Sequence, residues 1–226
     1  MLPNIFGKGL TPIRVSSSPR ARRFYLQQGA TKKVVFLTGE DEFVNYYEHA
    51  IILPNGDREY VLCLKESRGA CYLCDLGVKR YWVSVGTILD VDGFTTRDGR
   101  AFKYYKMLYA IKYRAAMTLT VYIDSLRREI PNFTLKNSVI LITRTPVANS
   151  SASGDLFQYS KTLSNNELNE IAEKYGVDLS PYNARDYIKI FEDNAGLKSW
   201  YDEIKSLSDE SESFEELDNN GDEVKF

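Results

Sequence analysis

The residues best suited to binding a metal ion are few and lie close together in the sequence. The chain has one histidine and three cysteines, in the order His49, Cys63, Cys71 and Cys74. Structural zinc ions are commonly held in a tetrahedron by three cysteines and one histidine, with two of the cysteines separated by two residues. The segment CYLCDLG supplies such a pair. The pattern predicts one structural zinc ion on these four residues, because four protein ligands leave no open position for catalysis.

Each of these residues also has a simpler interpretation. Free cysteines are often buried as small hydrophobic residues, a lone histidine is commonly an ordinary surface or core residue, and a Cys-x-x-Cys pair can be redox-active. All the histidine and cysteine of the chain, however, falls in one short stretch. This clustering favours the metal site over the separate interpretations.

A β-hairpin is expected to bring the first two ligands together. Asn55 and Gly56 stand between two apolar segments, and both residue types tolerate the positive φ of a tight turn. A loop made of Asn55, Gly56 and Asp57 would place His49 directly opposite Cys63, with Cβ atoms about 4.5–5.5 Å apart. A two-residue loop would send the two side chains to opposite faces of the hairpin.

The surrounding elements are predicted to be mainly strands. Apolar, β-branched and aromatic runs predict strands at VVFL (34–37), HAIIL (49–53), EYVLC (59–63), YWVSVGTILDV (81–91), AFKYYK (101–106), SVILITR (138–144) and LFQYSK (156–161). Apolar residues three or four apart predict a helix along Leu108, Ile111, Ala115, Leu119, Tyr122 and Leu126. A capping-box spacing at Ser164 and Glu167 begins a second helix, and a third begins near Pro181.

The predicted order of elements, with several strands followed by one helix and then two more strands, is that of an OB-fold. We therefore predict a mainly β protein with helices: an OB-fold-like five-stranded barrel with a zinc-binding subdomain, a C-terminal helical segment and a disordered acidic tail. The pattern does not distinguish this fold from another small barrel or an α+β sandwich.

The charge of the chain is unevenly distributed. The net charge is −2, yet the last twenty residues hold eight acids and one base, and the first 39 residues hold seven bases and no acid. A basic body with an acidic tail suggests a polyanionic partner for the body. An ordinary solvated surface with a passive tail is the simpler alternative.

The metal motif within this order of elements resembles the zinc-containing, helix-destabilising single-stranded DNA-binding proteins of T-even phages. The runs FLTGEDEF, YYEHAIIL, CLKESRGACYLCDLG and YWVSVGTILDVDG also resemble OB-fold proteins of this function from tailed phages more broadly. The resemblance covers roughly residues 34–160. It implies a non-enzymatic protein that coats and protects single strands during phage DNA replication, recombination and repair, in the cytoplasm of the infected host. It also implies that the acidic tail contacts replication or recombination proteins.

Single-stranded DNA is held by cations along its phosphates and by aromatic rings under its bases. The segment FKYYKMLYAIKYR interleaves the two residue types, and only one of the adjacent Tyr104 and Tyr105 can point inward in a strand. The predicted DNA contacts are Arg22, Arg23, Tyr81, Lys103, Tyr104, Tyr105, Lys106, Lys112 and Arg144. The predicted partner contacts in the tail are Phe214, Glu215, Glu216, Asp222, Glu223 and Phe226.

These predictions divide the chain into a basic N-terminal arm at 1–33, an OB-fold-like DNA-binding domain at 34–206 with the zinc site at 49–77, and an acidic tail at 207–226. The main alternative function is a zinc-stabilised adaptor or transcription cofactor that recruits partners through the tail. A metal-dependent nuclease using Asp90 and Asp92 is a weaker one, since Asp-x-Asp beside glycine is commonly a turn. The oligomeric state stays open, and no apolar run is long enough to suggest a membrane span.

Overall fold

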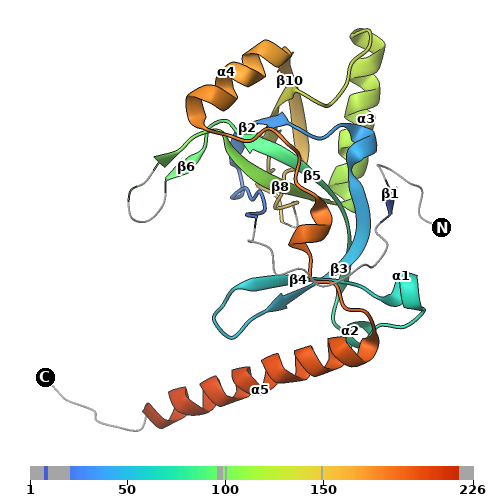
Figure 1. Ribbon diagram of the computed structural model, residues 1–226, viewed down its shortest axis with the longest axis vertical. Helices are drawn as coiled ribbons and strands as arrows, with labels where there is room; N and C mark the ends of the chain where they lie inside the picture. Colours follow the sequence, from blue (N-terminus) through green and yellow to red (C-terminus); the bar gives the residue numbers. More distant parts are fainter. Residues whose placement is uncertain (1–7, 10–20, 96–98, 100, 149, 219–226) are drawn as a thin grey trace, which may run out of the picture. The chain divides into compact units, whose positions relative to one another are not determined.

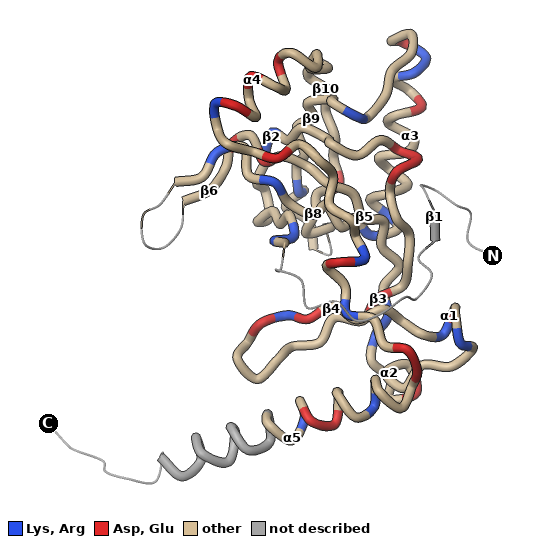
Figure 2. Tube along the Cα trace, in the orientation of Figure 1, with Lys and Arg blue, Asp and Glu red and all other residues tan. Residues whose placement is uncertain are grey.

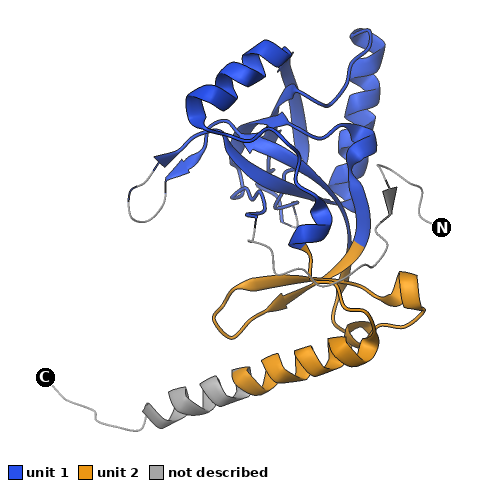
Figure 3. Cartoon of the chain, viewed as in Figure 1, with its two compact units in different colours: residues 1–10, 17–46, 82–187 blue, residues 11–16, 47–81, 188–226 orange. Residues whose placement is uncertain are grey.

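The computed structural model describes residues 8–9, 21–95, 99, 101–148 and 150–218, with side chains described for those between residues 21 and 207. The chain divides into two compact units (Figure 3). Unit 1 comprises residues 1–10, 17–46 and 82–187, and unit 2 comprises residues 11–16, 47–81 and 188–226. Among the described helices, none is both long enough and apolar enough to cross a membrane.

The strands form a mostly antiparallel sheet in a mixed α/β protein (Figure 1). Its hydrogen-bonded order is β1-β3-β5-β2-β9-β10, with β4 paired to β3 and β8 paired to β5. The strands are β1 (Lys8–Gly9), β2 (Thr31–Phe36), β3 (Val44–Ile52), β4 (Arg58–Leu62), β5 (Arg80–Asp90), β8 (Tyr105–Lys112), β9 (Ser138–Thr143) and β10 (Leu156–Thr162), with a separate pair β6 (Phe94–Thr95) and β7 (Ala101–Phe102). The pairings among the described residues do not close a barrel, so the OB-fold stays a prediction.

Five α-helices accompany the described strands: α1 (Lys65–Arg68), α2 (Tyr72–Asp75), α3 (Tyr113–Glu129), α4 (Asn165–Tyr175) and α5 (Asn194–Asp218). Short 3-10 turns lie at Glu40–Glu42 and Ala184–Tyr187. The predicted start of α4 is confirmed, because the Ser164 hydroxyl accepts a hydrogen bond from the Glu167 amide and the Glu167 carboxylate accepts one from the Ser164 amide. Gly176 ends this helix with φ +64.

The helix predicted to begin at Leu108 begins only at Tyr113. Leu108 and Ile111 lie instead in β8, which pairs with β5 from Asp90↔Tyr105 to Val83↔Lys112. Their spacing of three residues fits a helix, but both side chains are buried as strand residues. A full-length antiparallel partner outweighs the local periodicity.

Residues 21–33 were predicted to belong to a basic N-terminal arm, but they form part of the folded unit 1. Thr31–Lys33 belong to β2, which pairs with β9. Before it, Phe24 and Leu26 are buried in the core, and the Phe24 amide donates to the Leu108 carbonyl at 2.8 Å. The rest of the predicted arm, 1–7 and 10–20, lies outside the described residues.

The tail prediction of disorder from residue 207 is likewise corrected, because α5 continues to Asp218. Bases and acids are interleaved along the first half of this helix (Figure 2), as in the Lys198–Asp202 ion pair at 2.5 Å. Residues 219–226 lie outside the described part.

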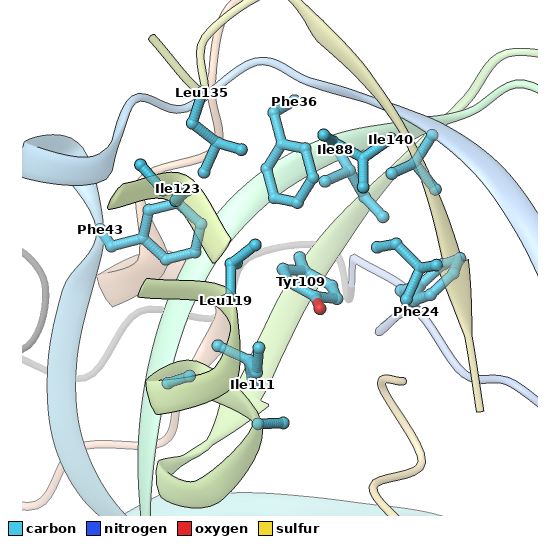
Figure 4. Packing of buried hydrophobic residues seen from close by; sticks show 14 of the residues in the cluster. Phe24, Phe36, Phe43, Ile88, Tyr109, Ile111, Leu119, Ile123, Leu135 and Ile140 are labelled. Carbon is cyan, nitrogen blue, oxygen red and sulfur yellow. The ribbon is translucent and has the colours of Figure 1, made fainter. Parts of the chain in front are cut away.

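The main core of unit 1 lies between the sheet and α3. Phe36 and Tyr109 are fully buried, with ring centroids 5.4 Å apart and planes at 89°. Ile111, Leu119 and Ile123 pack around them (Figure 4). This core provides the rigid support for the surface residues of unit 1.

Candidate metal centre

The four predicted metal ligands all lie in unit 2 and come together there. His49 is in β3, and Cys63 directly follows β4. Cys71 is the residue before α2, and Cys74 is in α2. Between these two pairs, α1 and Gly69, with φ +76, turn the chain back toward the hairpin.

The hairpin register differs from the predicted one by two residues. His49 pairs with Val61, not with Cys63, because the Leu53 amide donates to the Asp57 carbonyl and the loop is therefore residues 54–56. Side chains alternate between faces with a period of two, so a shift of two residues leaves Cys63 on the face that His49 occupies. The prediction that His49 lies directly opposite Cys63 was wrong, whereas the prediction that the two residues share one face of the hairpin was right.

The ligand atoms are spaced as a tetrahedral site requires. Cys63 Sγ is 3.5 Å from Cys74 Sγ, and His49 Nε2 is 3.5 Å from Cys71 Sγ and 3.6 Å from Cys74 Sγ. All four ligand atoms lie within 4.8 Å of one another. Metal–sulfur bonds of about 2.3 Å and metal–nitrogen bonds of about 2.0–2.1 Å give a tetrahedron with edges of about 3.5–3.8 Å. The cluster can therefore hold one metal ion.

The cluster is inside the core of unit 2. His49, Cys63 and Cys71 are buried, and Cys74 is partly exposed. The described residues provide no hydrogen-bond partner for His49 Nδ1. Four thiol and imidazole groups gathered in an apolar core, with no carboxylate among them, suit a soft metal ion.

The thiols are electrostatically unequal. The hydrogen bond with Cys63, and after it that with His49, lowers the pKa of Cys71 to about 3. The same hydrogen bond, together with burial, raises the pKa of Cys63. Burial also raises the pKa of Cys74. Without a metal ion the cluster favours a state in which only Cys71 is a thiolate. A bound metal ion would favour the thiolate form of all three cysteines.

Arg80, at the start of β5, is a neighbour of the cluster that the sequence analysis missed. Its Nη1 is 2.8 Å from Glu66 Oε1 of α1, and its guanidinium lies 4.4 Å from the ring centroid of Tyr47 in β3. Glu66 is the main cause of a raised Arg80 pKa, and Cys63 also contributes. The Arg80 guanidinium therefore interacts with Cys63 of the ligand cluster and with β3 and α1, which help to position the cluster.

The arginines among the predicted DNA contacts have different surroundings. Arg22 is exposed, with its guanidinium 5.0 Å from the ring centroid of Phe94. Arg144 is held by the Leu26 carbonyl at 2.9 Å and the Ser150 hydroxyl at 3.0 Å. Arg23 is partly buried beside β8.

The remaining predicted cations are three lysines, and Tyr81 is one of the predicted rings. Lys103 and Lys112 are exposed, and Tyr81 lies in unit 2. The Lys106 ammonium is 2.6 Å from the Asp178 carboxylate.

The two adjacent tyrosines have different neighbours, but strand alternation is not the reason, because β8 begins at Tyr105 and Tyr104 precedes it with φ +51. Tyr105 packs on the core of unit 1, whereas Tyr104 contacts Tyr175 of α4, with ring centroids 4.5 Å apart. Tyr175 was missed, since nothing in its local sequence marks its long-range partner.

Of the predicted partner contacts, Phe214, Glu215 and Glu216 fall in α5, beyond the described side chains. Asp222, Glu223 and Phe226 lie outside the described residues. Asp90 is buried and paired with Lys32, and its Oδ1 accepts a hydrogen bond from the Gly93 amide at 3.0 Å. Asp90 is the last residue of β5, and these contacts hold the turn that follows the strand.

Neither protein-family models nor curated proteins give a match to this chain. Its function therefore has to be argued from its own residues.

Proposed function

We propose that the chain is a non-enzymatic, zinc-stabilised protein that binds single-stranded DNA through unit 1, whose strands would form an OB-fold-like body. The observation that carries this proposal is the pairing of Tyr25 with Arg144. The Tyr25 side chain is 60% exposed, and the Arg144 guanidinium lies 5.7 Å from its ring centroid. An exposed ring beside a cation can accept a base while the cation meets the phosphate.

The backbone holds Tyr25 in this exposed position. Residues 24 and 26 are buried on either side of it, so their alternation with Tyr25 turns its ring outward. The Leu26 amide donates to the Ala152 carbonyl at 2.8 Å, and Arg144 donates to the Leu26 carbonyl at 2.9 Å. The ring and the guanidinium are therefore positioned before any ligand arrives, which lowers the entropy cost of binding.

Zinc is the metal we propose for the cluster in unit 2. Three thiolates and one imidazole in a tetrahedron suit zinc, and with all four positions taken by protein the ion would be structural. Its role would be to hold the hairpin, α1 and α2 together, since metal binding adds to the folding free energy. Resemblance to zinc-containing phage proteins supports the same assignment, with coating of single strands in replication, recombination and repair as the biological role.

Fluorescence anisotropy with labelled oligo(dT) and a duplex of equal length tests the DNA-binding proposal. We expect tighter binding to the single strand, with an affinity that falls with salt at a slope of about −0.7 per neutralised phosphate. Tyr25→Ala should weaken binding roughly 5- to 150-fold, the effect of one lost stack. Tyr25→Phe keeps the ring and should bind nearly as tightly as the wild type.

Val121→Ala is the matched surface control, because Val121 is 65% exposed on the outer face of α3. Equal affinity for single-stranded and duplex DNA would contradict a stacking mechanism. A wild-type protein that holds one zinc ion and binds neither DNA would favour the adaptor function instead.

A further inference from the structure

A pocket in unit 1 lies where α4 meets the strands and joins an aromatic pair to an apolar floor. It has a volume of about 410 Å³, within the range of about 300–1,000 Å³ typical of ligand sites. Val35, Val91 and Val139 contribute apolar lining, and Tyr104 and Tyr175 line it as well. Apolar side chains and aromatic rings beside polar groups suit a flat ring with apolar faces and a polar edge, such as a nucleobase.

The aromatic pair is formed at some cost to the backbone. Tyr104 has φ +51, a left-handed conformation that is an outlier for a bulky residue and is more easily adopted by glycine or asparagine. This conformation precedes β8 and brings the Tyr104 ring to 4.5 Å from that of Tyr175. A tyrosine at a position where asparagine is less strained indicates that the ring itself is used.

The charges around the pocket match those of one nucleotide. Three lysines and two glutamates line it: Lys33, Lys161, Lys174, Glu167 and Glu170. Lys161 and Glu167 form an ion pair at 2.8 Å and so neutralise each other. The remaining two lysines and one glutamate leave one positive charge, which a single phosphodiester would balance. Lys174 already lies 5.4 Å from the ring centroid of Tyr175.

From this juxtaposition of paired, mutually tilted tyrosine rings, apolar lining and excess lysine, we infer that the pocket binds one unpaired nucleotide of single-stranded DNA. The base lies against the tyrosine pair and the valines, and Lys33 or Lys174 meets the phosphate. This inference rests on the proposed function and adds to it a defined subsite, separate from the Tyr25–Arg144 pair.

Photo-crosslinking locates the subsite directly. An oligo(dT) in which single thymines are replaced by 5-iodouracil is irradiated with the full-length protein, and the crosslinked peptides are mapped by mass spectrometry. We expect crosslinks at Tyr104 or Tyr175. The affinity of Tyr104→Asn for oligo(dT), measured by anisotropy, should fall roughly 5- to 150-fold. Since asparagine tolerates positive φ, its melting temperature should not fall.

Tyr187→Ala is the matched control, because Tyr187 belongs to a second tyrosine pair of unit 1, with Tyr182, that does not line the pocket. If the wild type binds oligo(dT) but crosslinks only elsewhere, and Tyr104→Asn and Tyr175→Ala bind normally, the subsite is wrong and the proposed function stands. If the wild type does not bind oligo(dT), the proposed function fails and the subsite fails with it.

Discussion

The guanidinium of Arg80 stacks 4.4 Å from the ring centroid of Tyr47 while it pairs with Glu66. Arg80 thereby joins β3, which carries one ligand, to α1, which lies between two others. A dication bound to three thiolates and a neutral imidazole carries one net negative charge, and Arg80 is a nearby cation that offsets it.

We therefore expect Arg80→Ala to weaken zinc binding about 10- to 100-fold, as loss of an outer partner of a metal site does. Competition with a chromogenic chelator measures this affinity. Arg80→Lys should recover part of the zinc affinity through charge alone. Arg58→Ala, at an exposed position of the β3–β4 hairpin, should leave the zinc affinity unchanged. An Arg80→Ala protein with wild-type zinc affinity would show that Arg80 contacts Glu66 and Tyr47 without affecting the metal site.

Metal removal should loosen unit 2 and spare the core of unit 1. The hairpin and α2 meet mainly through the ligand cluster and its apolar neighbours, whereas Phe36 and Tyr109 pack in a separate core. Hydrogen exchange after chelation should show lost protection in residues 47–64 and 71–78, with β5 and β8 still protected within unit 1. Cys71→Ser should give the same pattern without a chelator. Uniform loss of protection across both units would contradict a local role for the metal.

Zinc binding should release about two protons at pH 8. Cys71 has a pKa of about 3 and contributes no proton, whereas the raised pKa values of Cys63 and Cys74 mean that both must lose one. Because protons compete with the metal, affinity falls as the pH falls, by roughly 100-fold per pH unit for two protons. Titration in weak buffer with a pH indicator counts the protons, and release of three would contradict this ordering of the thiols.

Ser164→Ala should lower the free energy of unfolding by about 1 kcal/mol, because the first turn of α4 loses its N-cap. Urea denaturation followed by circular dichroism measures the change. Thr118→Ala is a suitable comparison, since the Thr118 hydroxyl donates to the Arg114 carbonyl at 3.2 Å within α3 and caps no helix end. Equal stability of the wild type and Ser164→Ala would show that the start of α4 does not depend on this cap.

The features predicted correctly from sequence are those set by residue type or by short spacing. The four residues of the candidate metal cluster could be chosen because no other histidine or cysteine exists in the chain. The capping box of α4 depends on two residues three positions apart. The predicted register was wrong by two residues, but His49 and Cys63 were still correctly placed on one face because side chains in a strand alternate with a period of two.

The features missed depend on contacts between distant segments. Leu108 and Ile111 have helical spacing, and only their pairing with β5 makes them strand residues. The role proposed for Tyr25 depends on Arg144, and that of Tyr175 on Tyr104. No local pattern identifies such pairs, and the interleaved lysines and tyrosines of the sequence could not show which rings and cations would be neighbours.

The hairpin register also limits how the length of this segment can vary. His49 and Cys63 share a face because an even offset separates Cys63 from Val61, the residue paired with His49. Inserting or deleting one residue between Arg58 and Cys63 would turn the cysteine away from the metal, whereas a change of two residues would preserve its orientation. The metal centre thus imposes a parity rule on β4. Functional relatives of this chain should differ there by even numbers of residues, while the loop at 54–56 remains free to vary.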